Sequence, residues 1–288
     1  MAIRSLSERR RTLAGWLLLS PALLTVALFA ITPILVIARI SMAKADVFGG
    51  VTGAFTVDNY VALIDPVYGK TLGYSLGLAA LTSIFCLILG YAVSHYIVSR
   101  PADRQPLLLL LLIIPFWTDF LVRTFAWISL LGRGGPVLGL LDLFGVHANS
   151  LVPSQTAVVL AMIYSFLPTA VFPIYAAMRG IDPSVREAAS DLGAGWWQTH
   201  LRIVAPLSLP GIIAAFLLTF VPSLGVFVIP VLLGGGKDLL VGNLIVTLYT
   251  EFRNQPMGAA LSMILLGLML LSLLVAAVVL RTRARRTA

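Results

Sequence analysis

Charged residues and cysteines are scarce in this chain. Only 11% of its 288 residues are Asp, Glu, Lys or Arg, whereas soluble globular proteins carry about 25%. Hydrophobic residues make up 59%, and the mean hydropathy is +0.98. This balance excludes a soluble enzyme, a disordered chain and a typical nucleic-acid-binding protein. The lone Cys86 excludes a disulfide framework and a metal site built from several cysteines.

Long apolar runs dominate what remains. A helix needs about 20 mostly apolar residues to cross a bilayer, and the sequence predicts six such helices in one all-α, polytopic membrane domain spanning 1–288. The predicted spans are residues 14–38, 72–98, 106–131, 155–178, 207–231 and 257–280. Because the runs are continuous rather than alternating, a barrel is excluded. The first run is longer than a signal-peptide core, so we expect an uncleaved helix.

Basic residues gather on one side of these predicted spans. The two tails and the loops near 99–105 and 179–206 hold 13 of the 20 basic residues and five of the 12 acidic ones. The rest of the chain holds seven of each, so the whole net charge of +8 lies on this side. Positive loops stay in the cytoplasm, which predicts cytoplasmic N- and C-termini. The basic tails are also expected to touch anionic lipid, and nothing here calls for nucleic acid.

The loop at 179–206 has an amphipathic pattern of its own. Asp182 and Pro183 predict a helix start, and Gly193 with Gly195 predict its end in a sharp turn. One apolar stripe of this first helix consists of Val185, Ala188, Ala189 and Leu192. A second short helix would present Trp197, Leu201 and Val204 on one face and stop at Pro206. Such a pair either lies on lipid or docks a soluble partner.

The residues of this loop resemble the EAA loop of ABC importer permeases. Glu187-Ala188-Ala189 is followed after three residues by Gly193, and after nine more by Ile203 and Pro206. Ala205 stands where that pattern has Leu. The resemblance implies a type I ABC importer permease, with this loop seated in a groove of an ATP-binding subunit. It assigns Glu187 a polar contact and Gly193 the turn. The other coupling residues would be Ala188, Ala189, Leu192, Trp197, Ile203 and Pro206.

Further segments are similar to the first permease of spermidine/putrescine-type importers, over roughly residues 70–270. They are Pro115-Phe116-Trp117, Arg123, Ala126-Trp127, Leu167-Pro168, Pro173-Ile174-Tyr175, Phe227-Val228-Ile229-Pro230, Leu233-Gly234-Gly235 and Gly242-Asn243. The resemblance implies a bacterial inner-membrane subunit that moves a small organic solute, first of all a polyamine. An opine-like, aminophosphonate or other zwitterionic or anionic solute is the alternative. A secondary transporter working alone would leave the loop at 179–206 without a purpose.

The same resemblance names the partners. They would be a second permease subunit, two copies of a cytoplasmic ATP-binding subunit and a periplasmic solute-binding protein. ATP and Mg²⁺ would be bound by the ATPase, so this chain is expected to hold no cofactor and to be no enzyme. Gly69-Lys70-Thr71 mimics the end of a Walker A motif, but Ile64 stands where its first glycine is needed. His95, His147 and His200 lie in different segments without metal-ligand spacing, so we expect no metal.

Two charges lie inside the predicted third span. Asp119 and Arg123 are four residues apart, and charges at membrane depth are paired or face a polar interior. They could form a mutual salt bridge; otherwise Asp119 could receive a solute amine, or Arg123 a carboxylate or phosphonate. Nearby aromatic rings either pack or bind an ammonium. The predicted solute pathway consists of Asp119, Arg123, Phe116, Trp117, Tyr164 and Tyr175.

Overall fold

The computed structural model describes residues 2–46, 50–145, 147, 149–236 and 239–287, without side chains for 2–18 and 284–287. The chain divides into two compact units. One holds residues 1–63 and 247–264, and the other holds residues 64–246 and 265–288. The prediction of a single permease domain over 1–288 stays a prediction.

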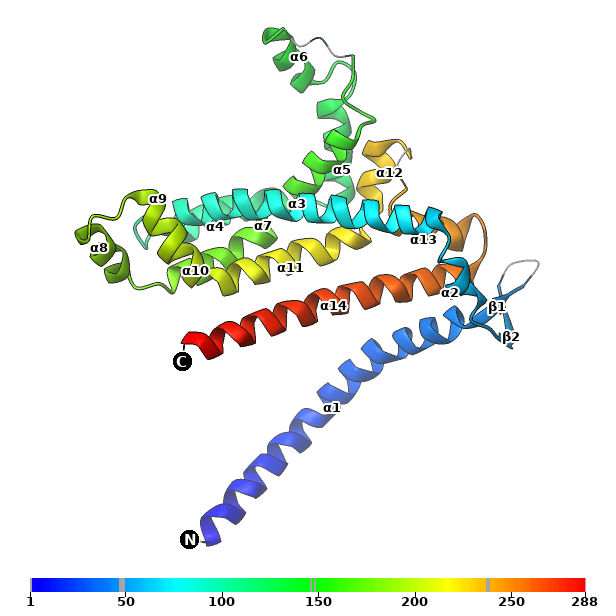
Figure 1. The fold of residues 1–288 in the computed structure, drawn as a ribbon, viewed down its shortest axis with the longest axis horizontal. Helices are drawn as coiled ribbons and strands as arrows, with labels where there is room; N and C mark the ends of the chain where they lie inside the picture. Colours follow the sequence, from blue (N-terminus) through cyan, green and yellow to red (C-terminus); the bar gives the residue numbers. More distant parts are fainter. Residues whose placement is uncertain (1, 47–49, 146, 148, 237–238, 288) are drawn as a thin grey trace. The chain divides into compact units, whose positions relative to one another are not determined.

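The first unit begins with helix α1 (Ala2–Ser41), whose part Leu19–Ser41 is long and apolar enough to cross a membrane. A small antiparallel hairpin, β1 (Ala43–Ala45) and β2 (Val51–Phe55), follows and leads into α2 (Asp58–Ala62) (Figure 1). The Asn59 amide donates to the carbonyls of Ser41 and Ala43, at 2.9 and 2.8 Å. The hairpin was not predicted, because its short strands carry no alternating pattern.

Three long helices form the centre of the second unit. They are α3 (Pro66–Val98), α7 (Gln155–Arg179) and α11 (Leu209–Gly225), which lie side by side (Figure 1). Small residues let these helices approach: a Cβ at Gly90 would stand 3.1 Å from Ala170, and one at Gly211 would overlap Pro173 and Ala177. The buried residues between them are Cys86, Ala170, Ile174, Met178, Val204 and Ala215.

Shorter elements surround this centre. In chain order they are α4 (Gln105–Ile113), η1 (Ile114–Trp117), α5 (Phe120–Leu131), α6 (Pro136–Leu143), α8 (Pro183–Asp191), α9 (Trp196–Thr199), η2 (His200–Val204), α10 (Ala205–Leu207) and α12 (Val228–Gly234). Two helices belong partly to each unit: α13 (Val241–Thr250) and α14 (Gln255–Thr287). A backbone bond ties the start of α13 to α3, since Val241 N–H donates to the Ser75 hydroxyl at 2.8 Å.

Five single segments in the described part of the chain are long and apolar enough to cross a membrane. A pair bent by 71°, Trp196–Leu207 with Leu209–Gly225, gives a sixth when its two helices are counted as one broken span. The predicted all-α fold with six spans is thus confirmed, but two predicted boundaries are wrong. The segment 106–131 breaks at Thr118, where the backbone is extended, and 207–231 breaks after Gly225, where Val226 is extended. Pro115 and the capping side chain of Asp119 favour the first break.

Candidate functional site

The loop at 179–206 folds as two short helices around a glycine turn. Asp182 caps α8 by accepting the Ser184 N–H at 2.9 Å, and this bond holds the pKa of the Asp182 carboxyl below its ordinary value. Gly193 has φ +77°, a left-handed conformation that glycine adopts without strain. Gly195 then caps α9. The predicted helix start and the predicted turn are both confirmed.

The second half of the loop departs from the prediction. The helix passes from α9 through the π-helix η2 into α10 and ends at Ser208, so Pro206 does not stop it. Pro206 lies inside this continuous stretch instead, directly after the π turn. Val204 is buried whereas Trp197 and Leu201 are exposed, so the three side chains do not share one face. The predicted single face is therefore wrong.

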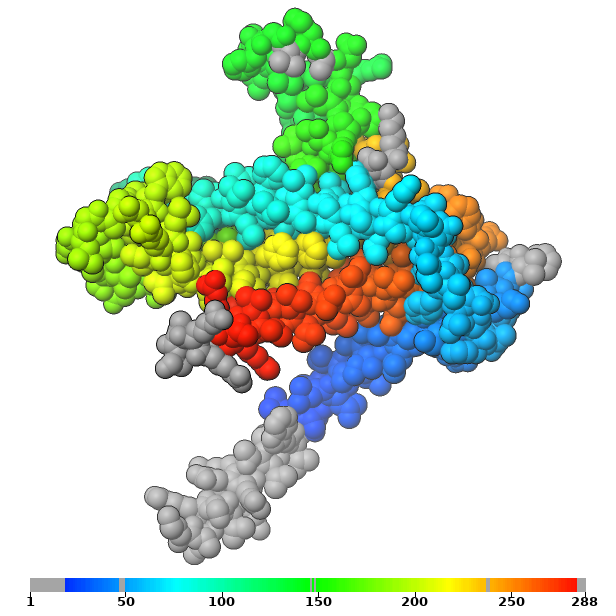
Figure 2. All heavy atoms as spheres, in the orientation of Figure 1, coloured from blue at the N-terminus to red at the C-terminus, as the bar shows by residue number. Residues whose placement is uncertain are grey.

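The loop, yellow-green in Figure 2, lies at one end of the second unit. Several of its apolar side chains are exposed. Leu192 is 89% exposed and Trp197 71%, whereas Ala189 is only 4% exposed, because it packs inside the chain. The predicted stripe is therefore divided between the chain's own interior and an outward surface. Of the remaining predicted coupling residues, Glu187, Ala188 and Pro206 are exposed and Ile203 is half-buried.

Two histidines that sequence reasoning left apart meet at the base of this loop. His95 Nδ1 of α3 lies 3.1 Å from His200 Nε2 of η2. The Trp196 ring stacks on the His200 ring with centroids 4.2 Å apart. The two histidines are 105 positions apart in the sequence, so no local spacing could have indicated the pair. A cavity of about 600 Å³ lies beside them, lined mostly by apolar side chains.

The charges predicted at membrane depth do not pair. Asp119 is exposed and caps α5, accepting the N–H groups of Leu121 and Val122 at 2.8 and 3.4 Å. Among the described residues no ion pair joins it to Arg123, so the expected salt bridge is wrong. Asp119 does lie one turn before Arg123, since its carbonyl accepts the Arg123 N–H at 3.1 Å, but its carboxylate is turned to the backbone N–H groups that it caps.

Arg123 faces aromatic rings instead. Its guanidinium carbon lies 5.1 Å from the centre of the Phe116 ring and 6.0 Å from that of Phe120. Phe116 stacks on Tyr164 of α7 at 5.1 Å, and Trp127 meets Tyr164 edge-on at 5.6 Å. The buried Arg123 Nε has no hydrogen-bond partner among the described residues. We call Arg123, Phe116, Tyr164 and Trp127 the aromatic group.

Besides Asp119, two of the predicted pathway residues lie outside this group. Trp117 is 79% exposed. Tyr175 is eleven residues beyond Tyr164 on α7, about 16 Å along the helix. It is buried there, with its hydroxyl bonded to Gln105 at 2.8 Å and to Arg179 at 3.4 Å. The predicted pathway set omitted Trp127. This residue is four positions after Arg123 and therefore lies one helical turn away on the same face of α5.

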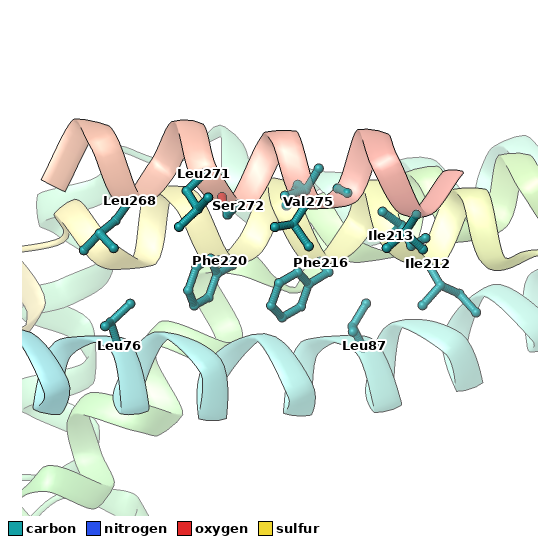
Figure 3. A pocket seen from close by; sticks show the side chains of 13 residues that line it. Leu76, Leu87, Ile212, Ile213, Phe216, Phe220, Leu268, Leu271, Ser272 and Val275 are labelled. Atoms are coloured by element: carbon teal, nitrogen blue, oxygen red, sulfur yellow. The ribbon is translucent and has the colours of Figure 1, made fainter. Parts of the chain in front are cut away.

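A separate cavity of about 540 Å³ lies between α3, α11 and α14 (Figure 3). Leu76 and Leu87 come from α3, and Phe216 and Phe220 from α11. Ser272 is its one polar lining residue, and none of the lining residues is charged. An ammonium or carboxylate would lose its hydration here without gaining a partner, so this cavity does not suit a charged solute.

The chain matches the family model described as "Binding-protein-dependent transport system inner membrane component" over residues 85–284. It is 38% identical to the spermidine/putrescine transport system permease protein PotB of Escherichia coli (strain K12) over 90% of this chain and 93% of that protein. It is 34% identical to PotB of Haemophilus influenzae (strain ATCC 51907 / DSM 11121 / KW20 / Rd), over 86% and 87%.

A solved structure shows the same fold. It is that of a bacterial ABC transporter involved in the import of the acidic polysaccharide alginate, with a TM-score of 0.74 and 16% identity, covering 97% of this chain and 99% of that chain. This supports the type I importer permease fold that the EAA pattern predicted. Several apolar helices and the family match also agree in making this a multi-pass inner-membrane protein. The chain belongs to the family of inner membrane components of binding-protein-dependent transport systems.

Proposed function

We propose that this chain is a pore subunit of an ABC importer that takes up a polyamine such as spermidine or putrescine. The observation that carries the proposal is the 38% identity to PotB over nine-tenths of the chain. A periplasmic binding protein delivers the solute to the outer face. The chain itself is a transporter subunit and performs no chemistry on the solute.

The loop at 179–206 is the part that receives the ATPase. Exposed Leu192 and Trp197 supply an apolar docking surface, and Glu187 adds a polar contact. The Gly193 turn fixes the angle between the two short helices. Two copies of an ATP-binding subunit bind ATP and Mg²⁺, one on this loop and the other on a second permease subunit. The exposure of large apolar side chains at a helix turn supports this role.

The aromatic group borders the solute's route. Phe116, Tyr164 and Trp127 offer ring faces, which attract an ammonium. The guanidinium of Arg123 already lies over Phe116, so a polyamine needs negative charge from elsewhere to enter. Asp119 supplies one carboxylate at the neighbouring helix break. The second permease subunit and the binding protein supply the others.

One observation favours the alternative solute. The Arg123 Nε is buried and has no partner among the described residues, and a guanidinium binds carboxylate or phosphonate oxygens well. A zwitterionic or anionic solute, such as an opine-like or aminophosphonate compound, would satisfy that nitrogen.

The orientation follows from the loop charges, with both termini in the cytoplasm. Labelling of single cysteines placed at residues 70 and 192, in a Cys86→Ala background in intact cells, tests this. A membrane-impermeant maleimide is expected to react at 70 and not at 192. Reaction at 192 alone would contradict the orientation.

ATP hydrolysis by the reconstituted complex tests the solute class. The complex is placed in nanodiscs with binding protein preloaded with putrescine, spermidine, an opine-like conjugate or an aminoalkylphosphonate. Stimulation by the polyamines alone is expected. Stimulation only by the acidic or zwitterionic solutes would overturn the polyamine assignment and point to Arg123.

A further inference from the structure

We call residues 179–206 the coupling loop. His95 and His200 join this loop to the central helices by a direct hydrogen bond. His95 lies near the C-terminal end of α3, and His200 opens the π turn η2 that follows α9. Their ring nitrogens Nδ1 and Nε2 are 3.1 Å apart, and His200 is buried. Bonds between side chains of α3 and this loop are otherwise absent from the hydrogen bonds of the described residues. The pair is therefore a specific point of attachment.

The surrounding groups fix which nitrogen carries each proton. His200 Nδ1 lies 2.9 Å from the Trp196 carbonyl oxygen, which can only accept, so Nδ1 carries a hydrogen and donates it. In a neutral ring, His200 Nε2 is then an acceptor. His95 Nδ1 must therefore carry the hydrogen and donate it to His200 Nε2. This leaves His95 Nε2 as the free basic site of the pair.

The hydrogen bond between the two rings therefore depends on how many protons the pair has taken up. A first proton adds at His95 Nε2 and leaves the bond intact, because the cationic ring still donates from Nδ1 and a charged donor strengthens it. A second proton must add at His200 Nε2, which is the acceptor of the bond. Doubly protonated, the two rings present N–H against N–H and the bond is lost.

The groups around the pair are aromatic rings and one cation. Arg186 of α8 lies close enough to act electrostatically on both His95 and Tyr91, and its buried Nε and Nη2 have no hydrogen-bond partner among the described residues. Tyr91 of α3 meets the His200 ring edge-on at 6.4 Å, and its hydroxyl has no hydrogen-bond partner among those residues either. The Trp196 ring lies edge-on to His95 at 5.7 Å and stacked on His200. No acidic side chain is bonded to either imidazole in the described part of the chain.

We propose that the His95–His200 bond is a positioning link that transmits motion of the coupling loop to α3, and that cytoplasmic acid releases it. The link holds with no proton or one added proton and opens with two. It rests on the proposed function only in that the motion it transmits comes from a docked ATPase. Coupling is therefore full at neutral pH and is lost on acidification, once the pair carries two added protons.

The chain offers a clean set of variants. Its three histidines are His95, His147 and His200. His147 pairs with Asp142 at 3.2 Å on an exposed stretch and lies outside the cluster, so His147→Asn is the matched control. The pair His95→Asn with His200→Gln keeps a donor near the Nδ1 position and an acceptor near the Nε2 position, without titration. The single changes His95→Phe and His200→Phe keep a ring and remove the bond.

Two measurements on the full importer complex in nanodiscs test the link. The first is ¹⁵N NMR with histidine labelled in this chain only, and it needs no solute. A through-bond coupling between His95 Nδ1 and His200 Nε2 is expected at pH 7.5 and absent at pH 5. No coupling at pH 7.5, with both rings ordered, overturns the proposal.

The second measurement is ATP hydrolysis stimulated by putrescine-loaded binding protein between pH 5 and 8. We expect the Phe variants to lose stimulation about fivefold at pH 7.5, since losing a net hydrogen bond shifts the equilibrium by that order. The Asn/Gln pair is expected to keep stimulation and to lose the fall at acid pH that wild type and His147→Asn show. Equal pH profiles for wild type and the Asn/Gln pair overturn the proposal. Stimulation absent from wild type, with the NMR coupling present, instead contradicts the proposed function.

Discussion

The coupling loop and the aromatic group differ in how far their side chains are exposed or packed against one another. On the loop, Leu192 and Trp197 are largely exposed, although the Trp197 ring meets that of Trp196 edge-on. In the aromatic group, Phe116 contacts both Tyr164 and Arg123, and the buried Arg123 Nε has no hydrogen-bond partner among the described residues. A surface that docks a large partner leaves apolar side chains exposed until the partner binds. A site for a small solute is already packed before the solute arrives, with few groups left to contact it. The two regions should therefore respond differently to substitution.

The largest effect is expected at the loop turn. Gly193→Arg places a branched cation at φ +77°, where any L side chain except Asn or Asp is strained by about 1–2 kcal/mol, and on the docking surface. We expect uptake to fall more than about tenfold, since the cost of strain alone corresponds to about that factor. Uptake by the reconstituted complex measures it.

Gly193→Asn is the control, because Asn tolerates this conformation and is expected to keep most of the uptake. Equal losses in the two variants would show that the backbone conformation of the turn is not what matters. Gly195→Ala, at an ordinary extended φ of −65°, is expected to be mild.

Packing between α7 and α11 sets the position of both regions and should be the next most sensitive feature. A Cβ at Gly211 would overlap Pro173 and Ala177, so Gly211→Ala forces the helices apart at a cost of about 1–3 kcal/mol. Thermal unfolding in detergent should shift down by several degrees. Gly77→Ala in α3 meets no atom within 4 Å and should be neutral or stabilising. A Gly211→Ala protein as stable as Gly77→Ala would refute the close packing.

The sequence predicted the loop better than the aromatic group, for physical reasons. Helix caps and glycine turns follow local rules, so Asp182, Pro183 and Gly193 could be placed from their neighbours alone. The aromatic group joins η1, α5 and α7, and a helix assumed to run through residue 118 put Asp119 beside Arg123. Pro115 and the capping Asp119 are local signals for the break at Thr118 that the sequence-based interpretation did not use. The contact between His95 and His200, which are 105 positions apart in the sequence, depends on how the helices pack.

In the aromatic group, a smaller change in apparent affinity is expected. Tyr164→Leu removes the ring that stacks on Phe116 and meets Trp127, contacts worth about 0.5–1.5 kcal/mol. The putrescine concentration for half-maximal uptake should rise about fivefold, with the maximal rate little changed.

Tyr175→Phe is the matched control on the same helix. It removes only the hydroxyl that bonds Gln105 and should leave that concentration unchanged. If Tyr175→Phe raises the half-maximal putrescine concentration as much as Tyr164→Leu does, the aromatic group has no special contact with the solute.

The smallest effect is expected from the charge of Asp182. Its pKa is lowered in the folded chain, so its contribution to stability is present above the ordinary carboxyl pKa of about 3.9 and is lost only as pH falls through the lower folded value. Asp182 therefore adds no pH dependence between pH 5 and 8. Asp182→Asn keeps a capping oxygen and should reproduce the wild-type profile of ATP hydrolysis. A profile flattened by Asp182→Asn would move the pH response from the histidines to this cap.

The central claim is that the loop at 179–206 couples ATP hydrolysis in partner subunits to passage of a polyamine through this chain. Its most direct test is uptake of labelled putrescine into proteoliposomes containing the whole complex, with loaded binding protein outside and ATP with Mg²⁺ inside. The account predicts ATP-dependent accumulation that Gly193→Arg abolishes while the complex still assembles. Accumulation without ATP, or equal accumulation by wild type and Gly193→Arg, would contradict it.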